Sequence, residues 1–162
     1  MRAAVLGALL SCLALPAAGC GYSAGQAAGG GKSIAVPLFT NTTFRRDLER
    51  DLTRAVHQEL RTRSGYALRS EPADLVLTGK VVEIAEGVLS EYEGAEIRES
   101  SVRIVAEITV TDSRTGEKIV DRLRVAERRS FAPVKGESVR SAESAAIRGL
   151  AERIVSTLEA GW

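Results

Sequence analysis

Residue types that commonly carry chemistry are sparse in this sequence of 162 residues. It contains one histidine, His57, and two cysteines, Cys12 and Cys20. A serine or cysteine nucleophile usually needs a histidine base, and His57 lies among arginines, opposite the apolar stripe of a predicted helix. We therefore interpret His57 as a solvated helix residue, and we predict neither a catalytic centre nor a metal site built on histidine and cysteine.

Arginines on two predicted strands form the second candidate for chemistry. The alternation of residues 101–112 places Arg103 on the polar side of its strand, and residues 118–128 place three more arginines on that side: Arg122, Arg124 and Arg128. Guanidinium groups pair well with phosphate and carboxylate oxygens. This surface is either an anion-binding face or an ordinary solvated sheet face, because antiparallel sheets commonly leave one face wet.

An acidic segment, Glu91–Glu96, could in principle bind a hard cation. Calcium loops are denser in aspartate than this segment, whose acidic residues are Glu91, Glu93 and Glu96. We predict a solvated loop here, and no metal or cofactor for the chain.

The first 31 residues have the layout of an export segment. Met1 and Arg2 give a positive start, Ala3–Leu15 is an apolar run of 13 residues, and small residues lead into Cys20. The run is too short to cross a bilayer, which takes about 20 apolar residues. We predict a signal peptide at residues 1–19, a Gly-rich tether at 20–31 and a single domain at 32–162.

Removal of the signal would leave Cys20 as the only cysteine, which excludes a disulfide framework. The stretch Ala17–Cys20 resembles a bacterial lipobox, which implies that Cys20 is acylated and anchors the chain. Gly21 follows, rather than the aspartate of an inner-membrane retention signal, so the resemblance implies the periplasmic side of the outer membrane. The alternative is an ordinary secretory signal with a leftover thiol.

Charge on the processed chain is balanced, with 21 basic and 21 acidic residues among 143. Nucleic-acid-binding domains carry a basic excess, so nucleic acid is not an expected partner. The length suits one domain with a substantial core.

The apolar pattern predicts two helices and several strands. Strands are expected at 33–39, 66–70, 75–86, 101–112 and 118–128, with a hairpin turn at 112–116, and helices at about 44–63 and 137–159. Residues expected on the apolar faces include Phe44, Leu48, Leu52, Val56, Leu60, Val102, Ile104, Ala106, Ile108, Val110, Ile119, Leu123, Val125, Val139, Ala142, Ala146, Ile147, Leu150, Ile154 and Leu158. These elements combine as an α+β two-layer sandwich, in which a mostly antiparallel four-stranded sheet packs on two amphipathic helices.

Several motifs, in this order, resemble the LptE family of lipopolysaccharide-assembly outer-membrane lipoproteins. They are Cys20–Tyr22, Ser33–Thr43 followed by an amphipathic helix, Ala73–Val81, the turn Asp112–Glu117 and the final helix. The resemblance implies a domain that plugs the lumen of the LptD β-barrel, helps that barrel to fold, and assists delivery of lipopolysaccharide to the cell surface. It does not imply which residues touch lipopolysaccharide.

The stretch Ile34–Thr43 also resembles the first strand and turn of two other lipoprotein groups, the activators of peptidoglycan synthases and the curli-secretion lipoproteins. Those domains carry further strand–helix units, whereas this chain passes from one helix directly into a run of strands. The LptE-like interpretation is favoured, and the regulator or secretion-channel interpretation stays open. A periplasmic hydrolase is disfavoured because no histidine base is suitably placed.

Overall fold

The computed structural model describes residues 31–91 and 97–160. The predicted signal peptide, Cys20 and most of the tether lie outside these residues, as do Glu93 and Glu96 of the acidic segment. None of the helices in the described ranges is both long and apolar enough to cross a membrane.

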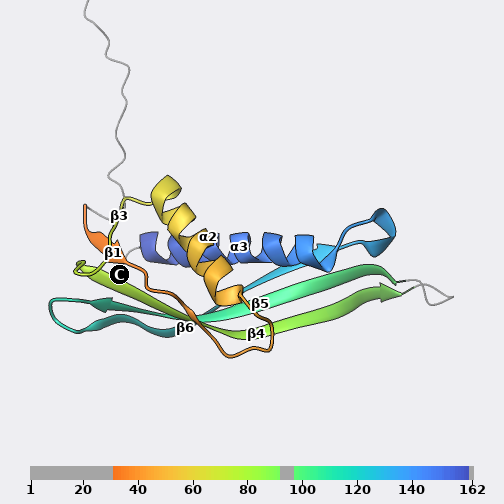
Figure 1. Ribbon diagram of the computed structural model, residues 1–162, viewed down its shortest axis with the longest axis horizontal. Coiled ribbons are helices and arrows are strands. Elements are labelled where there is room, and N and C mark those ends of the chain that lie inside the picture. Colours follow the sequence, from red (N-terminus) through yellow and green to blue (C-terminus); the bar gives the residue numbers. More distant parts are fainter. Residues whose placement is uncertain (1–30, 92–96, 161–162) are drawn as a thin grey trace, which may run out of the picture.

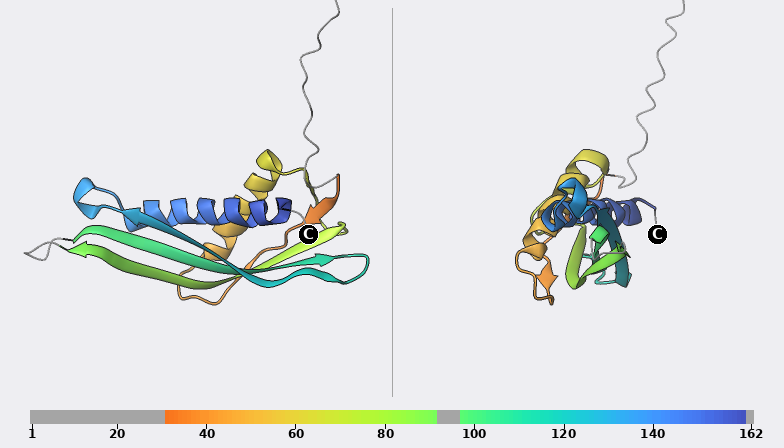
Figure 2. Two further views of the ribbon diagram at one scale, coloured as in Figure 1. Left: turned by 180° about the vertical axis from the view of Figure 1, so that it is seen from behind. Right: turned by 90° about the vertical axis from the view of Figure 1, so that its right-hand side faces the viewer.

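Two layers make up the described domain, a long twisted sheet and two helices on one face of it (Figures 1 and 2). The elements, in chain order, are β1 (Ser33–Ala35), β2 (Thr40–Asn41), α2 (Leu48–Arg63), β3 (Ala67–Leu68), β4 (Leu75–Glu91), β5 (Ile97–Asp112), β6 (Lys118–Phe131), the 3₁₀ turn η1 (Pro133–Lys135) and α3 (Val139–Glu159). Helix α3 runs along the sheet, and α2 crosses it at an angle.

The sheet is mixed but mostly antiparallel, which confirms the predicted α+β class. Its order is β3-β1-β4-β5-β6, with β2 also paired to β4. The three long strands are antiparallel to one another, while the short strands pair in parallel. There are six strands rather than four in this sheet, partly because the segment 33–39 does not form one strand. Pro37, which lacks a backbone N–H, lies in the gap between β1 and β2.

Strand β5 alternates as predicted, and its helix-facing side chains form the centre of the core. Each of these five residues is at most 1% exposed: Val102, Ile104, Ala106, Ile108 and Val110. Most of the predicted stripe of α3 is buried against them: Ala142, Ala146, Ile147, Leu150, Ile154 and Leu158.

The predicted core face of β6 is wrong in its first half. Ile108 of β5 pairs with Leu123, and Val110 pairs with Val120. Two residues of β6, Asp121 and Arg122, therefore lie opposite the single residue Thr109. This β-bulge, in which Arg122 has a φ of 49°, shifts the alternation by one residue. Val120 is therefore buried instead of Ile119, which is half-buried.

The start of α2 also differs from the prediction. The helix begins at Leu48, and Phe44 lies in the preceding loop with 85% of its surface exposed, not on the apolar face. Asn41 accepts hydrogen bonds from the N–H and hydroxyl of Thr43 and donates to the carbonyl of Arg45. These local bonds give the backbone an alternative to the helix.

Candidate functional site

The sheet face turned away from the helices is the candidate site, and we call it the open face (Figure 2). Cross-strand register places Ala85, Arg103 and Arg128 in one row, and Lys80, Glu107 and Arg124 in another. Its central members on the three long strands are Thr78, Lys80, Glu83, Ala85, Arg103, Val105, Glu107, Thr109, Arg124, Ala126 and Arg128.

Arg103 and Arg128 are directly opposite each other on β5 and β6. Arg103 forms an ion pair with Glu83 on its other side. Arg128 is exposed and forms no ion pair with any residue of the described ranges. Like charges directly opposite in a sheet are destabilising, so this pair costs the fold stability and leaves one guanidinium free for an external anion.

Arg124 lies opposite Glu107, with 3.8 Å between its Nε and the Oε2 of Glu107. The predicted fourth arginine, Arg122, is displaced into the bulge. Its backbone N–H donates to the hydroxyl of Thr109 at 3.1 Å, and its Nε lies 3.9 Å from Asp121. The structure thus brings three of the four predicted arginines onto one face, where two carboxylates compensate their charge only in part.

A buried carboxylate on the opposite side of β6 was not anticipated from the sequence. Glu127 is 8% exposed and forms ion pairs with Arg129 at 3.0 Å and with Arg153 of α3 at 2.6 Å. A Cβ at Gly149 would come within 2.9 Å of the Glu127 carboxylate, so the glycine allows α3 to approach β6 closely. The alternation of Leu123 and Val125, continued by two residues, places Glu127 on the helix-facing side, but its charge gave no reason to expect burial there.

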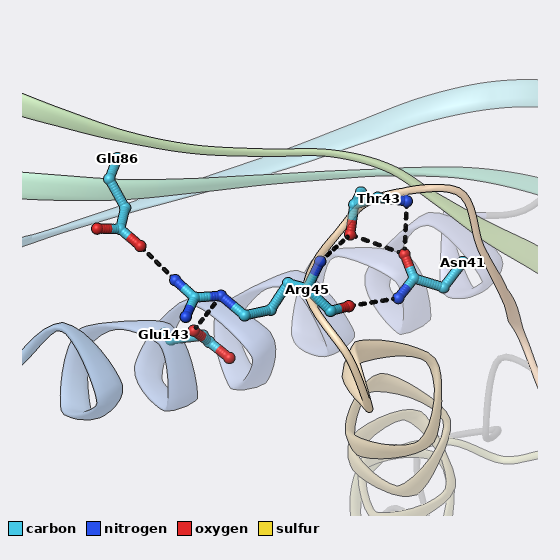
Figure 3. A network of polar contacts seen from close by, with 5 residues as sticks. All are labelled: Asn41, Thr43, Arg45, Glu86 and Glu143. Atoms are coloured by element: carbon cyan, nitrogen blue, oxygen red, sulfur yellow. Dashed lines mark hydrogen bonds and ion pairs between the residues drawn. The ribbon is translucent and has the colours of Figure 1, made fainter.

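Arg45 connects three parts of the molecule (Figure 3). Its guanidinium pairs with Glu86 of β4, and its Nε lies 3.5 Å from the carboxylate of Glu143 on α3. Its carbonyl accepts the side-chain amide of Asn41 at 2.7 Å. The loop before α2 is therefore fixed to the sheet and to the second helix, which makes Arg45 a structural residue.

His57 is half-buried rather than solvated. Its Nε2 lies 3.0 Å from the carbonyl oxygen of Val36. One turn earlier, Thr53 accepts the N–H of Phe39 at 3.0 Å. Polar residues of α2 thus hold the segment between β1 and β2. In the ranges 31–91 and 97–160, no three His, Cys, Asp or Glu side chains are grouped as a metal site would require.

Solved structures of the same fold come from Chlamydia trachomatis and Shewanella oneidensis. The protein CT253 from Chlamydia trachomatis superposes with a TM-score of 0.59 at 11% identity, covering 80% of this chain and 96% of its own. Rare lipoprotein B from Shewanella oneidensis superposes with a TM-score of 0.51 at 15% identity, covering 78% of this chain and 94% of its own. At such identities the likeness establishes the fold.

Family membership rests on the sequence. No curated protein matches the sequence significantly. The family model of LptE, described as lipopolysaccharide-assembly, matches residues 31–159, which is nearly the whole described domain. The chain therefore belongs to the LptE family of lipopolysaccharide-assembly proteins.

Proposed function

We propose that this chain acts in lipopolysaccharide assembly as the plug and folding aid of an LptD-like outer-membrane β-barrel. The observation that carries the proposal is the family match over residues 31–159, which includes both helices and all three long strands. A match confined to one hairpin would support only a shared fold element. The family is one of non-enzymatic assembly lipoproteins of the cell envelope.

The chemistry of the open face supports a position inside a barrel. Lumens of membrane barrels are polar, and a plug must present a polar surface to them. The open face mixes both signs of charge: Lys80, Arg103, Arg124 and Arg128 are basic, whereas Glu83 and Glu107 are acidic. Such a face can pair with lumen side chains of either sign.

Attachment through Cys20 to the periplasmic side of the outer membrane is part of the proposal. Several acyl chains on one residue give stable anchoring, because each buried CH₂ contributes about 0.8 kcal/mol. The Gly-rich residues 20–31 would then serve as a tether between the anchor and the domain at 32–162.

Lipopolysaccharide phosphates are the anions that we assign to Arg103, Arg124 and Arg128 of the open face, with the predicted fourth arginine, Arg122, beside them in the bulge. Guanidinium forks bind phosphate through two parallel hydrogen bonds. Arg128 lacks an ion pair within the described ranges and faces Arg103, so a phosphate between the two would relieve their repulsion.

Co-purification tests the partner. We expect the acylated protein, extracted from outer membranes in mild detergent, to bring down one large β-barrel in equal amount, as identified by mass spectrometry. A Cys20→Ala chain should be lost from the membrane fraction. Recovery of a peptidoglycan synthase, or of a ring of this chain alone, would contradict the proposal and support the alternative interpretation.

Lipopolysaccharide binding tests the arginine face separately. The double substitution Arg103→Glu and Arg128→Glu should weaken binding to immobilised lipopolysaccharide at least tenfold, with an unchanged circular dichroism spectrum. The matched control is Arg54→Glu, an exposed arginine on α2. Equal binding by the double variant and the control would remove the assignment while leaving the barrel partnership intact.

A further inference from the structure

Strand β6 forms one free edge of the sheet, and it is long. It has 14 residues and lies last in the strand order, next to β5. Within the described part of the chain, its backbone hydrogen bonds go to β5 only, and that of the Arg122 N–H goes to the side-chain hydroxyl of Thr109 on β5. From Leu123 to Ser130, past the bulge, the outward N–H and C=O groups are therefore available for another strand.

The charge on this edge is one-sided. Strand β6 contains five basic and two acidic residues, which gives a net charge of +3. One of the acidic residues, Glu127, is buried and already paired with Arg129 and Arg153. The basic residues are Lys118, Arg122, Arg124, Arg128 and Arg129. Two copies of β6 placed side by side would repel each other, so the edge is protected against self-pairing. An acidic segment would be attracted by the same charges.

A shallow groove of about 420 Å³ runs beside this edge. Its lining includes Leu123 and Val125 from the helix-facing side of β6, Arg124 and Ala126 from the open face, and Arg153 of α3. The remaining lining residues are Arg63 of α2 and Glu152, Ser156 and Thr157 of α3, so the groove lies between the outer edge of β6 and the helices. Leu123 is 40% exposed there, which leaves an apolar surface available to one side chain of a docked segment.

We propose that the outer edge of β6, from Leu123 to Ser130, binds an extended acidic segment of a partner protein as an added strand. Main-chain hydrogen bonds would supply affinity, and alternate side chains would supply specificity. Acidic side chains would lie near Arg124 and Arg128, and an apolar side chain would occupy the groove at Leu123. This interaction goes beyond lipopolysaccharide binding, since a lipid offers no row of backbone amides.

The test uses the full chain in mild detergent and three labelled ten-residue peptides. The first alternates glutamate and valine. The second replaces each glutamate by lysine. The third keeps the first sequence but carries N-methyl groups on four backbone nitrogens, two along each edge of the extended peptide, so that neither edge can pair as a strand. We expect fluorescence anisotropy to show binding of the first peptide, and at least tenfold weaker binding of the other two. Equal binding of the first and third peptides would overturn the proposal, because charge alone would then explain it.

Two variants place the site on the molecule. Leu123→Glu should weaken binding of the glutamate–valine peptide at least tenfold. The control is Leu38→Glu, which changes an exposed leucine between β1 and β2, away from β6, and should leave binding unchanged. Circular dichroism confirms that both variants are folded. Equal effects of the two variants would overturn the proposal. Concentration-dependent dimers in sedimentation that disappear in Leu123→Glu would also overturn it, since the occupant would then be a second copy.

Discussion

The two faces of strand β5 differ in burial and in charge, although their residues alternate along one segment. Ile104 is 1% exposed beneath the helices, while its neighbour Arg103 lies on the open face and pairs with Glu83. From Val102 to Val110, the helix-facing side chains are all apolar. The open face contains a like-charge pair that costs stability.

The two faces of the strand therefore contribute differently to the fold. The covered face is optimised for packing, because apolar burial contributes most of the stability of a small domain. The open face contains charges that the isolated fold does not need. We infer that substitutions of buried residues on the first face mainly change the free energy of unfolding, whereas substitutions of exposed charged residues on the second mainly change binding.

Truncation of neighbouring residues gives the largest test of this contrast. Ile104→Ala should lower the free energy of unfolding by about 2–5 kcal/mol, because it removes buried methyl groups and leaves a cavity. Arg103→Ala should lower it by at most about 1 kcal/mol, since its ion pair with Glu83 is partly solvated. Urea unfolding followed by circular dichroism measures both, and similar losses would contradict the contrast.

Added volume at two glycines of β4 provides the second test. A Cβ at Gly79 would lie 2.5 Å from the ring of Phe39, which is buried, so Gly79→Ala should cost about 1–3 kcal/mol. At Gly87 the nearest atom is the Ser101 hydroxyl at 3.8 Å, so Gly87→Ala should stay within about 0.5 kcal/mol of the parent. Thermal unfolding compares the pair. A harmless Gly79→Ala would show that the core beside β2 is loosely packed.

A smaller effect of opposite sign is expected on the open face. Arg128→Ala removes the like-charge pair with Arg103 and should raise the free energy of unfolding by about 0.2–1 kcal/mol. The same variant should bind immobilised lipopolysaccharide more weakly. Arg148→Ala, at an exposed position of α3, is the control for both measurements. A loss of stability in Arg128→Ala would mean that this arginine serves the fold.

The smallest predicted effect is pH-dependent and lies where β1 meets β4. The Ser33 hydroxyl and then its backbone N–H donate to Asp74 at 2.6 and 2.7 Å, and these bonds hold the pKa of Asp74 below its usual value. A lowered pKa stabilises the fold above the unfolded-state pKa, and this contribution is lost as the pH falls through the folded-state value. The urea midpoint should therefore fall more steeply below about pH 4 in the parent than in Asp74→Asn. If the urea midpoint falls equally with pH in the parent and in Asp74→Asn, the acid sensitivity comes from other carboxylates.

Sequence patterns located the covered face well because alternation in β5 is uninterrupted from Val102 to Val110. They failed where a local feature overrides periodicity. Because of the bulge at Asp121 and Arg122, Val120 is buried in place of Ile119. No residue type at these positions indicates an extra residue in the strand. The side-chain bonds of Asn41 delay α2 until Leu48, although Phe44 fits the helical spacing.

The candidate site was predictable in part for the same reason. Arg103, Arg124 and Arg128 share a face, as alternation requires, but Arg122 sits in the bulge. The partial neutralisation by Glu83 and Glu107 depends on strand register, which sequence alone does not fix. The groove beside β6 depends on how close α3 approaches, and that distance is set by Gly149 and the Glu127 ion pairs.

The length of the long strands sets the reach of the domain. Strand β5 has 16 residues, which at about 3.3 Å per residue gives about 50 Å. Strand β1 and the C-terminal end of α3 lie at one end of the molecule, while β4 ends and β5 begins at the other (Figure 1). The hydrocarbon core of a bilayer is about 30 Å thick. In the proposed position within a barrel, strands of this length would reach from one membrane surface beyond the other.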